Sequence, residues 1–270
     1  MFAGVTSVDA APGVGPLLRD WRMRRRLSQL DLALEAGVSA RHVSFVETGR
    51  ARPSAEMVLQ LAEHLDVPLR ERNQMLLAAG YAPRYGERDL DDPEMQPVRA
   101  AIQRVLDAHA PFPAVVVDRA WEMIAANASV PLLIADVAPH LMEPPVNVLR
   151  VSLHPEGMAP RIVNLAEWRA HLLERLQRQI IATGAEDLRS LYDEVSSYPG
   201  PRAASAEGLA GQIAVPLRLR ADAGRELAFI STVATFGTAV DITVAELAIE
   251  SFFPADEATA EAVREAAASR

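Results

Sequence analysis

The sequence predicts two domains of different class, an all-α bundle over residues 15–82 and an α+β domain over residues 98–262. Short helical patterns separated by Gly and Ser turns fill the first range. Strand patterns on both sides of a helical middle fill the second range, as in an α+β domain. Residues 83–97, PRYGERDLDDPEMQP, are acidic and bounded by proline, which is typical of a linker. Residues 1–14 and 263–270 are expected to be flexible tails.

The composition limits the class of protein. The chain has 270 residues, of which 50% are hydrophobic, so its core needs neither disulfides nor a metal, and it contains no cysteine. It has no pattern typical of a signal peptide and no apolar run of about 18 residues, so we expect a cytoplasmic protein without a membrane span. The net charge is −9, but residues 1–88 carry 12 Arg against 10 acidic residues, so this part favours phosphate.

Five short helices are expected in the first domain. They begin near Gly15, Gln29, Ala40, Ser54 and Leu69. Ser28 and Ser39 are typical N-caps of the second and third helices. Gly37, which lies between these two helices, is suited to a left-handed C-cap. The second and third helices are therefore joined by a short turn.

The apolar spacing predicts which faces of these two helices are buried. In the second helix, Leu30, Ala33 and Leu34 fall at i, i+3 and i+4 and are expected to face the core. In the third helix, over residues 40–47, Val43 and Val46 form the buried face. The opposite face of the third helix is left for solvent or a partner.

Two helices that meet at a short Gly-containing turn form a helix-turn-helix, whose second helix enters the major groove of DNA. The groove face of the third helix is expected to comprise Ala40, Arg41, Ser44 and Phe45. Arg41 can form a bidentate bond to guanine, and Phe45 can contact a thymine methyl group. The other expected DNA contacts, mainly to phosphate, flank these helices. They are Ser28, Gln29, Ser39, Arg50 and Arg52.

The segment SQLDLALEAGVSARHVSFVETGR resembles the XRE-type, lambda-repressor-like helix-turn-helix regulators. The resemblance is carried by Ser28-Gln29, Gly37-Val38-Ser39, Glu47-Thr48-Gly49-Arg50 and Pro53-Ser54. A free carboxylate at Glu47 would be repelled by DNA phosphates and needs a partner. The resemblance implies that this partner is Arg22, which would tie the first helix to the third. The alternative is two unlinked surface charges.

The second domain begins with a helix and a hairpin and ends with strands. The expected helices cover residues 98–109, 165–181 and 186–195, and the expected strands cover residues 114–118, 121–125, 213–220, 226–236 and 249–253. Trp121 and Met123 are expected on one face of the hairpin's second strand, either in the core or lining a pocket. The segment VSLHPEGMAPRI, residues 151–162, is either a surface loop or a ligand clamp.

Three segments look like the MmyB-like transcription regulators. They are LRERNQMLLAAGYAP, PFPAVVVDRAWEMIAAN and IESFFPADEA. The resemblance implies a PAS-like sensor and a one-component regulator whose apolar ligand is similar to a fatty acid. The candidate ligand-binding residues are Trp121, Met123, Arg150, His154 and Arg161, with Arg150 or Arg161 as the cation for a carboxylate head group.

Two other functions stay open from the sequence. The second domain could mediate only dimerisation or protein interaction, without a ligand. An enzyme with a DNA-binding appendage is the other class, but the chain has no H-E-x-x-H, G-x-S-x-G or phosphate-loop motif. The six histidines show no metal-ligand spacing, so we expect no metal and no cofactor besides a bound lipid. Because one helix-turn-helix contacts only a half-site, a homodimer is expected.

Overall fold

The computed structural model describes residues 13–201, 214–221 and 224–268, and the chain divides into two compact units. The first unit extends through Glu87 and includes Val240–Ile242, and the second unit comprises the rest of the described chain. The division falls inside the predicted linker. Within the described residues, no helix is long and apolar enough to cross a membrane.

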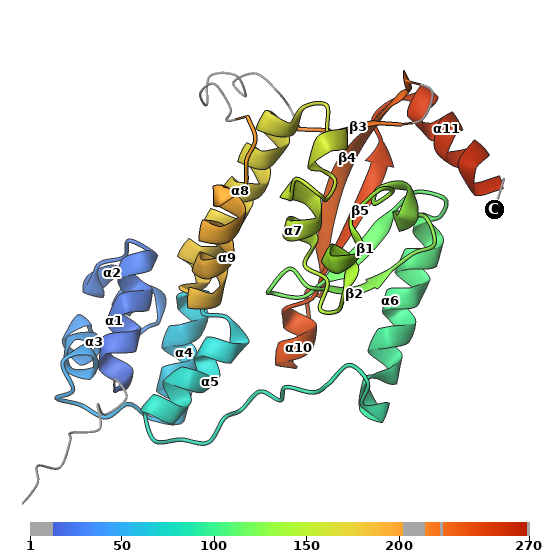
Figure 1. Cartoon of the computed structure of the whole chain (residues 1–270). Helices are drawn as coiled ribbons and strands as arrows, with labels where there is room; N and C mark the ends of the chain where they lie inside the picture. The colour runs from blue at the N-terminus through green and yellow to red at the C-terminus, as the bar shows by residue number, and fades with distance from the viewer. Residues whose placement is uncertain (1–12, 202–213, 222–223, 269–270) are drawn as a thin grey trace, which may run out of the picture. The chain divides into compact units, whose positions relative to one another are not determined.

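The first unit is a bundle of five helices, as predicted (Figure 1). The helices are α1 (Val14–Arg24), α2 (Gln29–Glu35), α3 (Ala40–Glu47), α4 (Ala55–His64) and α5 (Leu69–Ala78). The side chains of Ser28, Ser39 and Ser54 each accept a hydrogen bond from a backbone amide of the first turn. The predicted N-caps Ser28 and Ser39 are thus confirmed, and Ser54 caps α4 in the same way. Gly37 has a φ of 65°, the left-handed conformation that the turn between α2 and α3 requires.

The buried face of α2 differs from the prediction. Leu32 is buried, whereas Leu30 and Leu34 are 58% and 72% exposed. The helix carries apolar residues on both possible faces, so spacing alone does not select one. The capping box at Ser28 fixes the start of α2, and the hydrogen bond from Gln29 to Glu47 fixes its rotation against α3. In this orientation Leu32 faces the core.

A buried ion pair joins α1 to α3, as the resemblance implied. The Arg22 guanidinium donates through Nε to Glu47 Oε1 at 2.6 Å and through Nη2 to Oε2 at 2.9 Å. Gln29 Nε2 donates to the same Oε2 at 2.7 Å. The side chains of Arg22 and Glu47 are only 11% and 2% exposed. Burial raises the pKa of Glu47, but the bonds from Arg22 and Gln29 and the arginine charge outweigh burial, so that this pKa lies below its usual value.

The second unit contains one antiparallel sheet and several helices (Figure 1). Its strands are β1 (Ala114–Val117), β2 (Met123–Ala126), β3 (Leu217–Arg220), β4 (Glu226–Thr235) and β5 (Ala248–Pro254), in the order β2-β1-β5-β4-β3. Its α-helices are α6 (Gln96–His109), α7 (Val148–Leu153), α8 (Leu165–Thr183), α9 (Glu186–Ser197), α10 (Ile242–Ala245) and α11 (Glu257–Ala268), and its short 3-10 helices are η1 (Pro93–Met95), η2 (Val130–Leu132), η3 (Pro139–Met142) and η4 (Ala159–Arg161). The predicted strand start at Ile213 lies outside the described residues.

The two faces of the sheet belong to different apolar clusters. On one face, Val115 and Phe252 share a cluster with buried residues of α7, α8 and α9. On the other face, Val116 and Ile249 pack with Leu106 of α6. Figure 1 shows α6 on one side of the sheet and α7 and α8 on the other. The larger cluster therefore lies between the sheet and the helical middle of the domain.

Three sequence predictions need correction here. The linker ends before residue 97, because η1 begins at Pro93 and α6 at Gln96, and the buried Met95 anchors the chain. The tail predicted at residues 263–270 is helical as far as Ala268, since its alanine-rich sequence favours helix and Val263 of α11 is buried. Trp121 precedes β2 in the turn, with a φ of 66°, so it is not on the face of a strand.

The ion pair between Arg22 and Glu47 generates a stability prediction. Glu47→Ala should lower the free energy of unfolding by about 3–5 kcal/mol, because it leaves a mostly buried arginine without its carboxylate. Glu186→Ala, which breaks an exposed pair with Arg189, should cost about 0–1 kcal/mol and serves as the control. Denaturant unfolding measures both, and equal effects would contradict the structural role of the pair.

The same pair predicts a pH dependence. A carboxylate whose pKa is lowered in the folded state stabilises the fold above its unfolded pKa of about 4.3 and loses this contribution as the pH falls through its folded pKa. The stability difference between wild type and Glu47→Gln should therefore be constant near neutral pH and should shrink only below about pH 4.3. A difference that already shrinks at neutral pH would contradict the lowered pKa.

Candidate DNA-binding surface and ligand cavity

The exposed face of α3 presents the residues predicted to contact bases. Val43 and Val46 are buried, as expected, while Arg41 is exposed and Phe45 is partly exposed. The guanidinium carbon of Arg41 lies 5.1 Å from the centre of the Phe45 ring, one helical turn away. This contact holds the arginine along the outer face of α3.

The residues predicted to contact phosphate on either side of α3 make different contacts in the structure. Ser28 and Ser39 cap their helices. The Gln29 side chain donates to Glu47, so in this structure it supports α3. Arg52 differs from the prediction, because its guanidinium donates to the Ala79 carbonyl at the end of α5.

Arg50 differs from Arg52 in this respect. It is exposed, and among the described residues its side chain forms no hydrogen bond or ion pair. Its guanidinium is therefore available to a phosphate, and the assignment of this contact stays a prediction.

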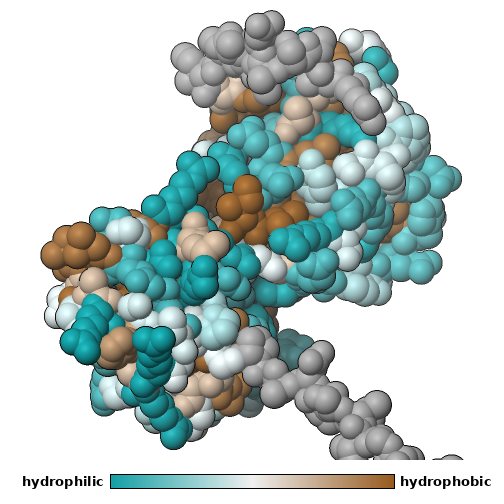
Figure 2. All heavy atoms as spheres, turned by 90° about the vertical axis from the view of Figure 1, so that its left-hand side faces the viewer, coloured by the Kyte–Doolittle hydropathy of each residue, from teal (hydrophilic) through white to brown (hydrophobic). Residues whose placement is uncertain are grey.

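Exposed apolar side chains are spread over both units. Those with the largest exposure include Met23, Leu30, Leu34, Leu77, Ile181, Val233, Val240 and Phe253. Figure 2 shows that on the face in view apolar residues form separate groups bordered by hydrophilic ones. Isolated groups of this kind are normal for a protein surface, so exposure alone does not identify a partner surface.

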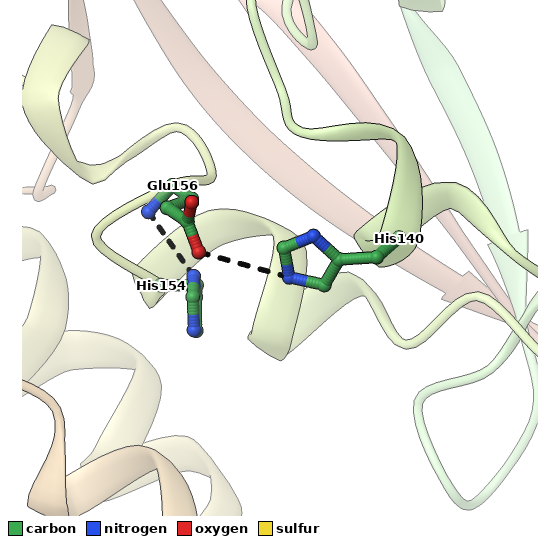
Figure 3. A group of neighbouring side chains, drawn as sticks. All are labelled: His140, His154 and Glu156. Atoms are coloured by element: carbon green, nitrogen blue, oxygen red, sulfur yellow. Dashed lines mark hydrogen bonds and ion pairs between the residues drawn. The ribbon is translucent and has the colours of Figure 1, made fainter.

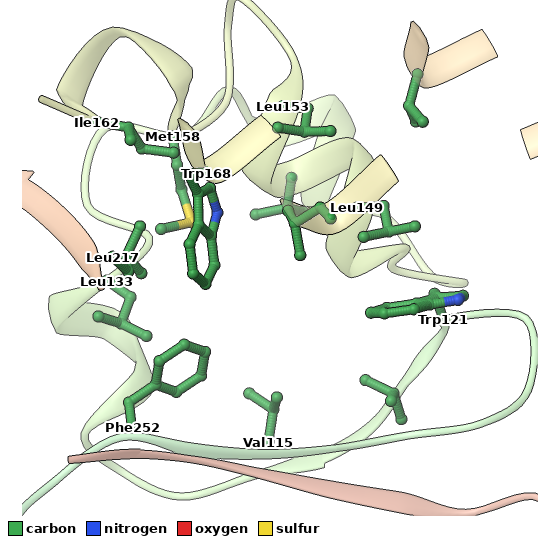
Figure 4. Packing of buried hydrophobic residues seen from close by; sticks show 14 of the residues in the cluster. Val115, Trp121, Leu133, Leu149, Leu153, Met158, Ile162, Trp168, Leu217 and Phe252 are labelled. Atoms are coloured by element: carbon green, nitrogen blue, oxygen red, sulfur yellow. The ribbon is translucent and has the colours of Figure 1, made fainter. Parts of the chain in front are cut away.

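The second unit contains an apolar cavity between β1, β5, α7 and α8. Its lining residues are Val115, Trp121, Met123, Val130, Leu133, Ile134, Met142, Val146, Val148, Leu149, Val151, Ser152, Met158, Trp168, Leu172, Leu217, Glu250 and Phe252. All but Ser152 and Glu250 are apolar. In Figure 4 the side chains of Trp121, Trp168 and Phe252 surround a common open space.

The cavity is small. The space open to the centre of a water molecule is about 70 Å³. Sites for drug-sized ligands measure about 300–1,000 Å³. A ligand with a long chain therefore requires movement of the wall.

One of the two polar lining residues, Glu250, belongs to an ion pair that sequence reasoning missed. Glu250 of β5 accepts a hydrogen bond from Arg175 Nη1 of α8 at 3.0 Å. The Arg175 guanidinium carbon lies 4.4 Å from the centre of the Trp121 ring. The sequence feature that could have indicated this pair is the position of Glu250. It shares the inward face of β5 with Ala248 and Phe252, and the other residues of that face are apolar.

The five candidate ligand residues divide into two groups. Trp121 and Met123 line the cavity, and their ligand-binding role stays a prediction. Arg150, His154 and Arg161 are not among the lining residues, which differs from the prediction.

Each candidate cation is engaged elsewhere. Arg150 donates through Nε and Nη2 to the Glu194 carboxylate at 2.8 and 2.7 Å. Tyr198 donates to the same carboxylate, and burial together with this bond raises the pKa of Tyr198 to about 12. Arg161 donates to the carbonyl oxygens of Leu133 and Ala135. Both guanidinium groups are therefore bonded to other protein groups, and neither arginine lines the cavity.

His154 lies in a different group of side chains. His140, His154 and Glu156 bring three possible metal-ligand atoms within 4.8 Å of one another (Figure 3). The Glu156 amide donates to His154 Nδ1 at 3.1 Å, and His140 Nε2 lies 3.9 Å from Glu156 Oε2. Two imidazoles and a carboxylate suit a divalent transition metal, but the group is largely exposed and one ligand nitrogen is already bonded. We therefore assign it no metal.

Comparisons with known proteins agree with this division of the chain. Residues 18–72 match the helix-turn-helix family, which covers α2 and α3. Residues 98–266 match the MmyB-like transcription regulator ligand binding domain, which contains the cavity. No curated protein matches the chain. Since the second match spans more than half of the sequence, the chain belongs to the MmyB-like transcription regulators and combines a helix-turn-helix with the ligand-binding domain of that family.

Proposed function

We propose that the chain is a one-component regulator that binds operator DNA through α3 and takes a small apolar, fatty-acid-like molecule into the cavity. The cavity carries this proposal. Its wall is apolar apart from two residues, as in sites where a few polar groups orient an apolar ligand. A domain that served only to join two chains would need no such cavity. The single antiparallel sheet with a cavity against one face supports a PAS-like sensor, and DNA binding supports a cytoplasmic location.

The proposed docking of α3 follows from its exposed residues. In a helix-turn-helix, the second helix lies in the major groove with its first turns at the base edges. Arg41 lies in the first turn of α3 and is exposed, so it is placed to read a guanine. Arg50 follows the helix and is placed to bind phosphate.

These two arginines give a prediction about specificity. Arg41→Ala should relax the preference at one base pair and cost about 1–3 kcal/mol of specific binding. Arg50→Ala should weaken binding to all sequences alike and reduce the slope of log K against log salt by about 0.9. Titrations of operator and random DNA at several salt concentrations measure both effects. An equal loss of specific and non-specific binding for Arg41→Ala would exclude Arg41 as a base reader.

We also propose a homodimer held by apolar surface of the second unit. Ile230 and Phe253 are register partners on β4 and β5 and are 40% and 44% exposed. They share one side of the sheet, so together they offer an apolar contact. Two copies would supply the two half-sites that helix-turn-helix dimers bind.

The dimer is tested by sedimentation at micromolar concentration. Wild type should sediment as a dimer, and the double variant Ile230→Ser/Phe253→Ser should sediment as a monomer with weaker operator binding. Ile181→Ser removes an apolar side chain that is 57% exposed on α8 and should leave the dimer intact. A wild-type monomer that still binds operator tightly would contradict the proposal.

Ligand binding is tested by thermal shift with alkyl-chain compounds of increasing length. A ligand at 100 times its Kd stabilises the fold by about 2.7 kcal/mol. The shift should grow with chain length, because each buried methylene contributes about 0.8 kcal/mol. Val151→Phe, which fills the cavity, should abolish the shift. Arg150→Ala and Arg161→Ala should keep it, because neither residue lines the wall. No shift with any compound would leave dimerisation as the function of the domain.

A further inference from the structure

Glu250 is a carboxylate on an apolar wall. It lies on the central strand β5, between Val115 of β1 and Val233 of β4 in the sheet register. Its side chain is only 6% exposed, yet it lines the cavity together with Val115. A buried charge is costly unless it is paired, so its presence here calls for an explanation.

Arg175 uses only part of the hydrogen-bonding capacity of Glu250. Within the described part of the chain, the bond from Arg175 Nη1 to Oε2 is the one hydrogen bond that this carboxylate accepts. An ionised carboxylate has about four acceptor positions on its two oxygens. Glu250, which lines the cavity, therefore keeps acceptor positions for a further donor.

The Arg175 guanidinium already interacts with two groups of the protein. It is bonded to Glu250 and stacks on the Trp121 ring at 4.4 Å. Trp121 is held in turn, because its Nε1 donates to Gln179 Oε1 at 2.8 Å. Arg175 itself is not among the lining residues. An anionic ligand would have to displace Glu250 from this arrangement to reach the arginine.

Ser152 is the other polar residue of the wall. Its Oγ accepts a hydrogen bond from Trp168 Nε1 at 3.0 Å, which leaves one neutral O–H donor. A single hydroxyl does not neutralise a carboxylate in an apolar site. A ligand in the cavity therefore meets unused acceptor positions on the negatively charged Glu250. Among the described lining residues, no cation faces it.

We propose that the cavity selects alkyl-chain ligands whose polar end is a neutral hydrogen-bond donor, such as a hydroxyl, and that this end donates to Glu250. The selectivity rests on the proposed ligand-sensing function and narrows its chemistry. A carboxylate end would lie next to a carboxylate of like charge. An ammonium end would add an unpaired positive charge beside the neutral pair of Arg175 and Glu250.

The test compares decanol, decanoate and decylammonium, which share one chain length and differ in the polar end. Binding to the full chain is measured by calorimetry and by thermal shift at about pH 8, where carboxylic acids with a pKa of about 4 are ionised. Decanol should bind at least about tenfold more tightly than either ion, because its hydroxyl donates to Glu250 without bringing a further charge into the apolar wall. Decanoate or decylammonium binding as tightly as decanol would overturn the selectivity and leave the sensor function standing. Binding of none of the three would overturn both.

Variants of Glu250 test the assignment to this residue. Glu250→Gln removes the negative charge and leaves Arg175 unpaired, so decanoate should gain at least about tenfold in affinity and overtake decanol. Glu250→Asp keeps the charge and should keep the exclusion of decanoate, which covers the case in which Glu250→Gln does not fold. Glu194→Gln removes a charge from the pair with Arg150 outside the cavity and should leave the wild-type order unchanged. The same reversal in Glu194→Gln, or no change in Glu250→Gln, would contradict the proposal.

Discussion

Each unit of the chain buries a glutamate, and the need to pair that carboxylate determines what surrounds it. Removing a carboxylate from water costs several kcal/mol unless an opposite charge and hydrogen bonds replace the water. Glu47 obtains this from Arg22 and Gln29, and the result is that α1 and α2 are both fastened to α3. Glu250 obtains it from Arg175, which fastens α8 to the central strand. The first pair orients the helix for DNA, and the second places one polar group in an apolar cavity.

The arginines of the first unit divide between structure and surface. Arg22 and Arg52 donate to groups on other elements and stabilise the bundle. Arg41 and Arg50 form no hydrogen bond through their side chains within the described residues. Structural arginines keep the helices in register, while free ones can exchange water for phosphate or base edges without breaking an internal contact. The net charge of residues 1–88 is only slightly positive, but it does not show that Arg41 and Arg50 are exposed and available to DNA.

The sequence predicts local structure well because caps and turns are decided by neighbouring residues. Ser28 and Gly37 bond or bend the backbone within a few positions of themselves, so the five helices follow from their spacing. The partner of an arginine is decided by tertiary packing instead. Arg150 forms its ion pair with Glu194, which lies 44 residues later in the sequence. Arg175 and Glu250 are 75 residues apart. No spacing rule reaches across such separations, so the wall could be predicted as apolar while its polar pair could not.

Under the proposed function, the methionines of the cavity are the lining side chains best suited to make room for a ligand. A ligand changes DNA occupancy only if it binds one conformation of the protein more tightly than another. The space within the wall is about 70 Å³, so a long chain cannot enter it without displacing side chains. Met123, Met142 and Met158 all line this space, and methionine adapts more readily than branched residues because it is unbranched and has three rotatable bonds. Met123 belongs to β2 and Met142 to η3, so a ligand that displaced both side chains would act on two elements of the domain. Under the proposed function, a wall expanded in this way would be the second conformation that regulation requires.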